Sequence, residues 1–275
     1  MQCMSPIFIR QKNGERQFVP CGKCNFCLMS RRADWTFRLK EQQRVSVTAY
    51  FLTLTYDDEH LPEDGKVDKR ELQLFFKRIR KQQDNIIKEL SKVDKTALKW
   101  PKIKYYAVGE YGTKTKRAHY HAIMYNMHPI LVENIYNHWT SGHSMCVPSN
   151  GATIHYTTKY VINNEDPDYK GFSLISKGLG QSYELAADYH RSGNISVVYS
   201  DGVPQRLPRY YKDRFFTGWQ KKVIAKRTEN EMQEKYDKEV ERLSRIHPNP
   251  VAYISERTIN FHESVKKKIN KQNKI

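Results

Sequence analysis

The chain has 275 residues, 39% of them hydrophobic, which is enough for a sizeable core in one domain with appendages or in two small domains. The 47 lysines and arginines outnumber the 30 aspartates and glutamates, and this net charge of +17 favours a polyanionic partner, above all a nucleic acid on whose bases the 18 tyrosines can stack. No apolar run is long enough to span a membrane and no cleavable leader precedes the chain, so we expect a protein that stays in the cytosol.

Hydrophobic periodicity predicts an α+β fold. In chain order we expect a helix over 31–44, a strand over 45–56, a helix over 68–90, strands over 102–111 and 118–126 joined as a hairpin, and a helix over 129–140. A loop rich in Gly, Ser and Pro leads to residues 152–164, where the first part is predicted as strand and the second as helix. This order favours a central antiparallel sheet with helices packed on one face.

The two ends of the chain differ from this central region. Residues 1–30 are irregular and bear cysteines, turns are frequent over 165–225, and the chain from 226 on is charge-dense and helical with a break at 247–250. We therefore expect a cysteine-rich segment with the first helix over 1–44, a sheet domain over 45–225 and a charged helical extension over 226–275. The lysine-rich end either contacts DNA or is a solvated tail.

Two histidines stand out in the predicted strand AHYHAIMYN, namely His119 and His121. Alternate residues of a strand project to the same side, so the two imidazoles face one way and Tyr120 faces the other. Such a pair either shares one cation or consists of two exposed strand histidines. The pair by itself does not distinguish these alternatives.

Glu110 lies on the preceding strand, near the histidine pair if the two strands pair as a hairpin. Its carboxylate either joins the imidazoles or pairs with Lys114 or Lys116 in the hairpin loop. Two imidazoles and a carboxylate suit Mn²⁺ or Mg²⁺, and Zn²⁺ is also chemically acceptable. Such a set of three ligands leaves open positions for phosphate oxygens.

The segment YTTKY places Tyr156 and Tyr160 four residues apart, with Lys159 beside the second. On a helix, residues at this spacing share a face, so the two hydroxyls lie together. A phenol with a pKa of about 10 attacks poorly at neutral pH unless a metal polarises the phosphate and an ammonium stabilises the developing charge. The alternative is that both tyrosines pack in the core.

Three cysteines, Cys21, Cys24 and Cys27, follow one another at intervals of three, and Cys3 offers a fourth thiolate. Four thiolates form a tetrahedral Zn²⁺ site that would fix the N-terminus to the domain. Free thiols and an iron–sulfur cluster are the alternatives. Cys146 is isolated, and we expect it to be structural.

Six segments carry a family resemblance: VPCGKCNFCLMSRRADW (19–35), FLTLTYDDEHLP (51–62), VGEYGTKTKRAHYHAIMYN (108–126), YTTKY (156–160), SKGLGQSY (176–183) and LPRYY (207–211). With these segments, in this order, the chain resembles the replication initiator proteins of small single-stranded DNA phages, the microviruses, and most closely those of the gokushovirus branch. These proteins are HUH endonucleases. The His-hydrophobic-His strand together with Tyr-x-x-Lys-Tyr is far more specific than either motif alone.

The resemblance implies a ferredoxin- or RRM-like HUH endonuclease domain over 45–225 that acts in rolling-circle replication as a metal-dependent nickase and strand transferase. One tyrosine attacks the origin phosphodiester of the viral strand, keeps the 5′ phosphate as a phosphotyrosine and frees a 3′ hydroxyl for the host polymerase. After one round the other tyrosine cleaves the regenerated origin. The released 3′ end then closes a circle, so the cycle needs two nucleophiles and no ATP.

Carried over to this sequence, the resemblance makes His119 and His121 ligands of Mg²⁺ or Mn²⁺. It makes Tyr156 and Tyr160 the nucleophiles and Lys159 the basic group between them. Glu110 as third ligand is our own inference from strand pairing, because the position of that ligand varies in the family.

DNA contacts are expected on both sides of this site. Thr53 and Thr55 match the first motif of the family and form the floor of the DNA site, and Lys114, Lys116 and Arg117 make the hairpin loop basic. Many relatives have a second lysine after the tyrosines where this chain has Asn163, so no role for that lysine is carried over.

The partners so implied are single-stranded origin DNA, phage replicative-form DNA and a host DNA polymerase, in the cytoplasm of a bacterial host and without a membrane. A host helicase is also expected, since the sequence has no phosphate-binding loop. A non-catalytic single-strand-binding protein or a zinc-bearing regulator would share the charge and the aromatic content. A plasmid initiator or relaxase of the same superfamily would share the chemistry but not the flanking motifs.

Overall fold

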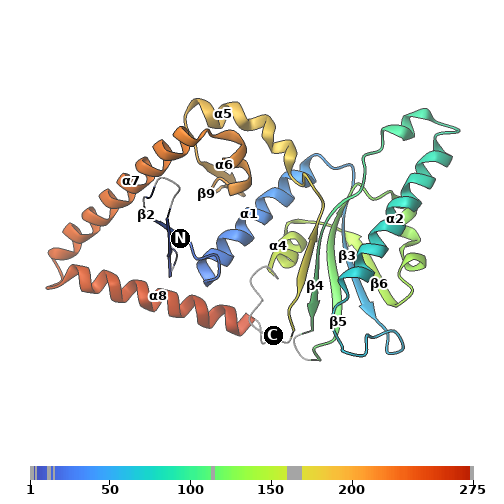
Figure 1. The fold of residues 1–275 in the computed structure, drawn as a ribbon, viewed down its shortest axis with the longest axis horizontal. Coiled ribbons are helices and arrows are strands. Elements are labelled where there is room, and N and C mark those ends of the chain that lie inside the picture. Colours follow the sequence, from blue (N-terminus) through green and yellow to red (C-terminus); the bar gives the residue numbers. More distant parts are fainter. Residues whose placement is uncertain are drawn as a thin grey trace. The chain divides into compact units, whose positions relative to one another are not determined.

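The computed structural model describes residues 3, 5–10, 14, 16–112, 115–159 and 169–272. They form two compact units, which are described separately: Met1–Asp34 together with Tyr183–Ile275, and Trp35–Ser182. The chain is α+β, as predicted (Figure 1). The functional boundaries predicted at residues 44 and 225 stay a prediction.

The unit Trp35–Ser182 is built on a five-stranded antiparallel sheet with strand order β6-β3-β5-β4-β7. Its strands are β3 (Ala49–Tyr56), β4 (Lys104–Tyr111), β5 (Ala118–Tyr125), β6 (Gly142–Pro148) and β7 (Phe172–Ile175). The predicted hairpin is confirmed as β4 and β5, and β3 pairs with the other side of β5. This places β5 and its histidines at the centre of the sheet.

One face of the sheet is covered by α2 (Lys69–Leu90), as the apolar periodicity predicts (Figure 1). The helix begins after Asp68, whose carboxylate accepts hydrogen bonds from the first free backbone N–H groups and so caps the helix. Its apolar stripe packs into the core with side chains from β3 and β5: Leu72, Phe75, Phe76 and Ile79. Burial of four such side chains on one stripe fixes the rotation of the helix about its axis.

Helices also pack on the opposite face, which the sequence did not predict. Here α1 (Asn25–Arg44) contributes Leu39 and α4 (Gly151–Lys159) contributes Ile154 to a second core cluster, with Phe51 of β3 and Tyr106 of β4. The strand predicted at the start of 152–164 is therefore wrong, because these residues form the helix α4. The strand β6 lies where a loop was predicted.

Short helical elements lie between or after the sheet strands. They are η1 (Lys95–Lys99), α3 (Pro129–Glu133), η2 (Ile135–His138) and η3 (Gln181–Ala186). The helix predicted over 129–140 is thus a single turn of α-helix followed by a 3₁₀ turn. Leu131 and Ile135 from these turns are buried in the same cluster as α2.

The other unit holds two hairpins and several helices. Its elements are β1 (Ile7–Arg10), β2 (Arg16–Val19), the N-terminal part of α1, α5 (Ala187–Ser192), β8 (Val197–Ser200), β9 (Val203–Arg206), α6 (Arg209–Phe215), α7 (Gly218–Ser244) and α8 (Pro250–Gln272). The predicted charged C-terminal helices are confirmed, with the break between Ser244 and Pro250 (Figure 1).

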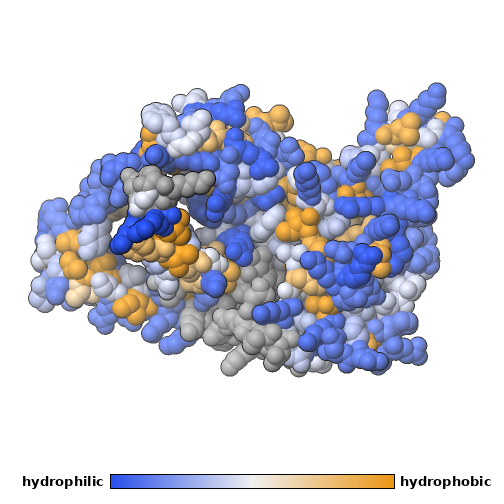
Figure 2. Space-filling model, viewed as in Figure 1, coloured by the Kyte–Doolittle hydropathy of each residue, from blue (hydrophilic) through white to orange (hydrophobic). Residues whose placement is uncertain are grey.

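The surface is strongly polar. Figure 2 shows hydrophilic side chains over most of the visible face, with smaller apolar patches between them. Within the described part of the chain, no helix combines the length and the apolar character needed to cross a membrane.

Gly142 opens β6 directly opposite Tyr56 and has a φ of +144°. A Cβ at this position would overlap the backbone of Thr55, so no side-chain rearrangement relieves the clash. We expect Gly142→Ala to lower the free energy of unfolding by about 3 kcal/mol, as measured by urea denaturation. The control is Gly151→Ala, where an added Cβ meets nothing within 4 Å and the change should stay within about 0.5 kcal/mol. Equal effects of the two substitutions would contradict the argument.

Candidate active site

The hairpin of β4 and β5 brings together the three residues predicted as metal ligands. Glu110 is the direct cross-strand partner of His119, and His121 projects to the same side two residues further along. The Nε2 atoms of His119 and His121 lie 2.8 Å and 3.0 Å from one oxygen, Oε1 of Glu110. Glu110 is 5% exposed and His121 is 6% exposed, so the carboxylate is directed at the imidazoles in a largely buried site.

This arrangement fits a divalent cation. The second carboxylate oxygen of Glu110, Oε2, is buried and has no hydrogen-bond partner among the described residues, which is unusual for a carboxylate unless a further ligand is bound. One ligand atom from each of the three residues lies within 4.8 Å of the others. Adjacent ligands of an octahedral ion, each about 2.1 Å from it, are about 3 Å apart, which agrees with the observed separations. Two imidazoles and one carboxylate leave positions open for substrate oxygens.

Both imidazoles are oriented by their other ring nitrogen. Nδ1 of His119 lies 3.0 Å from the backbone carbonyl oxygen of Arg117, and Nδ1 of His121 lies 3.0 Å from Oγ1 of Thr53. Such partners fix the ring and the tautomer of a metal-binding histidine. Burial lowers the pKa of His119, but the hydrogen bond and the negative charge of Glu110 outweigh it and raise the pKa overall.

Tyr120 anchors the strand between the two histidines from the opposite face, as the alternation predicts. Its hydroxyl lies 2.6 Å from that of Tyr56, accepts a hydrogen bond from the backbone N–H of Asp68 and donates to the carbonyl of Asp68. Tyr56 in turn donates to Glu71 of α2. This buried network ties β3 and β5 to the start of α2 and holds the backbone of the site in place.

Tyr156 lies over the site from α4. Thr158 and Ile154 on the buried side of α4 fix the helix, the former with Oγ1 3.0 Å from Oγ1 of Thr36 on α1. Tyr156 is 42% exposed, so the alternative of a core tyrosine is wrong for this residue. Its hydroxyl lies 3.4 Å from Nε2 of His121, and the two rings are 5.1 Å apart. A phenol oxygen is therefore placed directly beside the candidate metal ligands.

Two of the predicted site residues, Tyr160 and Lys114, lie outside the described residues. Lys159 is the last residue of α4. Lys116 has a φ of +54° in the hairpin loop and places its ammonium 5.4 Å from the ring centroid of Tyr169.

The remaining residues predicted to contact DNA lie at the same end of the sheet. Arg117 donates hydrogen bonds to the backbone carbonyl of Tyr56 and forms an ion pair with Asp58, at 2.7 Å. Thr55 is the cross-strand partner of His119. DNA contact by these residues stays a prediction.

Phe51 is a site residue that sequence reasoning missed. Its ring stacks on His121, with the centroids 5.2 Å apart and an angle of 17° between the planes, and its centroid lies 5.9 Å from that of Tyr156. Alternation along β3 places Phe51 on the same face as Thr53, but nothing in the sequence indicates which rings it meets. The ring supports both the imidazole and the phenol.

The four cysteines of the predicted zinc site also lie together, in the other unit. One Sγ of each of Cys3, Cys21, Cys24 and Cys27 lies within 4.8 Å of the others. Backbone N–H groups of Cys24 and Lys23 lower the pKa of Cys21 to about 6, whereas burial raises that of Cys27 to about 12. No disulfide joins these residues or Cys146, and burial raises the pKa of Cys146 to about 12.

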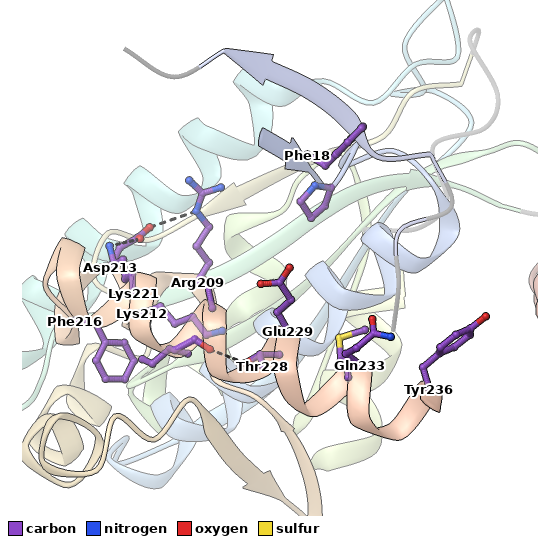
Figure 3. A pocket seen from close by; sticks show the side chains of 14 residues that line it. Phe18, Arg209, Lys212, Asp213, Phe216, Lys221, Thr228, Glu229, Gln233 and Tyr236 are labelled. Carbon is purple, nitrogen blue, oxygen red and sulfur yellow. Dashed lines mark hydrogen bonds and ion pairs between the residues drawn. The ribbon is translucent and has the colours of Figure 1, made fainter. Parts of the chain in front are cut away.

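A cavity of about 980 Å³ lies in the same unit as the cysteines, between β2 and the helices α6 and α7 (Figure 3). Its charged lining is paired internally: Asp213 accepts from Lys221 at 2.9 Å and from Arg209 at 3.4 Å. Phe18 and Phe216 contribute apolar surface. The pairing leaves these cations engaged with a carboxylate, so the cavity does not have the character of a phosphate site.

Comparison with known proteins gives matches of one kind. Residues 49–165 match a family of replication-associated proteins described by the name ORF2, a range that runs from β3 past α4. The chain is 30% identical over 226 residues to "Replication-associated protein VP4" of Bdellovibrio phage phiMH2K, covering 74% of this chain and 67% of that protein.

Two further relatives are similar at lower identity. "Replication-associated protein ORF2" of Spiroplasma virus 4 is 27% identical over 232 residues, which cover 74% of this chain and 69% of that protein. "Replication-associated protein ORF4" of Chlamydia phage 1 is 26% identical over 223 residues, which cover 71% of this chain and 53% of that protein. No solved structure matches the chain.

Proposed function

We propose, because the chain belongs to the microvirus-type family of phage replication-associated proteins, that it starts rolling-circle replication by nicking the viral strand at the phage origin. In this proposal it is an HUH-type single-strand endonuclease that later rejoins the strand into a circle. The observation that carries the proposal is the 3.4 Å separation between the hydroxyl of Tyr156 and Nε2 of His121. It places a nucleophile beside a two-histidine, one-carboxylate set.

The cleavage step exchanges one phosphodiester for another. The phenol oxygen of Tyr156 bonds to the phosphorus, its proton passes to solvent, and the bond from phosphorus to O3′ breaks. O3′ takes up a proton and leaves as a free 3′ hydroxyl, while the 5′ phosphate stays on the tyrosine. In the closing step a 3′ hydroxyl attacks this phosphotyrosine and the phenol is released. We assign Tyr160 as the second nucleophile and Lys159 as the cation beside both.

Glu110, His119 and His121 would hold Mg²⁺ or Mn²⁺, which polarises the phosphate and stabilises its charge when bound. Thr53 and the carbonyl of Arg117 keep the imidazoles oriented for this role. Phe51 limits the ring positions of His121 and Tyr156, so that the phenol approaches from one side.

The substrates we propose are single-stranded origin DNA and replicative-form DNA in the cytoplasm of a bacterial host. The net charge of +17 supports binding to a polyanion, and Lys114, Lys116 and Arg117 are the proposed contacts at the site, with Thr53 and Thr55 as its floor. Host DNA polymerase would extend the free 3′ hydroxyl, and a host helicase would open the duplex.

The test is incubation of the full chain with labelled single-stranded oligonucleotides that tile the origin region of the phage genome, with Mn²⁺ or with EDTA. We expect a covalent adduct that survives denaturing gel electrophoresis, forms only with the metal, and maps by peptide mass spectrometry to Tyr156 or Tyr160. Binding without an adduct on any strand would overturn the nickase and favour a non-catalytic single-strand-binding protein.

A further inference from the structure

The cysteine cluster has the dimensions of a metal site with one ion. Sγ of Cys3 lies 3.8 Å from Sγ of Cys24, and Sγ of Cys21 lies 3.9 Å from Sγ of Cys27. Four sulfurs about 2.3 Å from a central Zn²⁺ at tetrahedral angles are about 3.8 Å apart. Both separations are far longer than a disulfide bond of about 2.05 Å. A cluster of several iron ions would hold the four sulfurs further apart than this.

The backbone around the cluster is arranged to stabilise thiolates. The backbone N–H groups of Cys24 and Lys23 point at Sγ of Cys21, at 3.3 Å and 3.5 Å, and that of Cys21 points at Sγ of Cys3, at 3.3 Å. Gly22 makes this tight turn possible with a φ of +75°. N–H groups directed at sulfur reduce the negative charge that four thiolates concentrate around one ion.

A helix start adds to this stabilisation. Cys24 directly precedes α1 and Cys27 lies in its first turn, where the positive end of the helix dipole and unpaired backbone N–H groups favour anions. The guanidinium of Arg31, one turn further along, comes within 4.0 Å of the position that a Cβ of Gly22 would occupy. Positive charge therefore surrounds the sulfurs.

The position of the four cysteines gives the site a structural task. Cys3 precedes β1 and Cys21 follows β2, so the sulfurs close the base of the β1–β2 hairpin. Each of these strands has four residues, and β1 is exposed along its whole length. A two-stranded hairpin of this size is not stable alone in water. Without a link at its base, the hairpin has little that would hold it to α1.

From this geometry we infer that Cys3, Cys21, Cys24 and Cys27 bind one structural Zn²⁺, which fastens the β1–β2 hairpin to the start of α1. The inference is independent of the proposed nickase, because it concerns residues outside the unit that carries the candidate active site. Four protein ligands fill a tetrahedral ion, so this metal takes no part in cleavage.

The first measurement is the metal content of the purified full chain, expressed in medium with zinc and iron, by inductively coupled plasma mass spectrometry. We expect about one zinc ion per chain in the wild type and about a tenth or less in Cys21→Ser, Cys24→Ser. Cys146→Ala is the matched control and should keep its zinc, because Cys146 lies in β6 of the other unit. Zinc-free wild type, or one equivalent of iron in place of zinc, would overturn the inference.

A second measurement covers the case in which the cysteine variants fail to fold. The wild-type chain is alkylated with iodoacetamide before and after treatment with a zinc chelator, and each cysteine is followed by peptide mass spectrometry. We expect the four thiols to react at least about tenfold more slowly before chelation. Equal rates in the two states, or disulfides among the four, would contradict a zinc site. Neither readout depends on DNA cleavage, so failure here is distinct from failure of the proposed nickase.

Discussion

The double variant Tyr156→Phe, Tyr160→Phe is expected to lose covalent attachment to single-stranded origin DNA by at least about 10⁴-fold. No phenol oxygen then remains beside the histidine pair to attack the phosphorus. DNA affinity should change little, because both rings stay in place and only the hydroxyls are lost. Adduct formation is measured on denaturing gels at saturating Mn²⁺, and DNA affinity by fluorescence anisotropy.

The single variants identify the first nucleophile. If Tyr156 opens the cycle, as its position beside His121 suggests, Tyr156→Phe alone removes the first adduct and Tyr160→Phe keeps it. Tyr136→Phe is the control: Tyr136 is an exposed tyrosine of the same unit, in η2, and should react as the wild type does. An undiminished adduct in the double variant would exclude both tyrosines as nucleophiles.

The second large effect is expected from the metal ligands. Glu110→Gln keeps the shape of the side chain but removes the charge that faces both imidazoles, and His121→Ala removes a ligand atom. We expect each to weaken Mn²⁺ binding by at least about 100-fold and to abolish adduct formation at low metal concentration. Mn²⁺ affinity is measured by electron paramagnetic resonance.

His138→Ala provides the matched control for the metal experiment. His138 belongs to η2, whose Ile135 packs with α2 on the opposite face of the sheet, so this imidazole is remote from the candidate ligands. Its removal should leave Mn²⁺ affinity unchanged. Because the cysteine site binds tightly, the protein is dialysed against a weak chelator that removes Mn²⁺ and leaves zinc. Unchanged Mn²⁺ affinity in Glu110→Gln would contradict the proposed ligand set.

The central sheet and its histidine pair were predictable because they rest on local patterns. Alternation along 118–126 gives the shared direction of the imidazoles, and the short loop before this strand gives the hairpin that brings Glu110 opposite His119. The face of α2 follows from its apolar spacing alone. In each case the residues that decide the structure are close in sequence.

The errors arose where distant contacts decide. The segment GHSMCVP has a glycine and a proline at its ends and resembles a loop, yet it forms β6 because β3 offers a free edge and the proline falls at the last position of the strand. The β-branched start of 152–164 favours a strand, yet Ile154 and Thr158 pack against the sheet and α1 as a helix. The ring of Phe51 on His121 likewise depends on packing across strands.

The order in which the site can assemble follows from the hairpin of β4 and β5. Glu110, His119 and His121 lie within one hairpin, a unit that forms in about 1–10 μs, whereas Tyr156 joins His121 across 35 residues and only after β6 and α4 have packed. Loop-closure entropy delays such a contact relative to the hairpin. A nascent chain would therefore acquire its cation-binding residues before its nucleophile, and would be unable to cut DNA until the unit is complete.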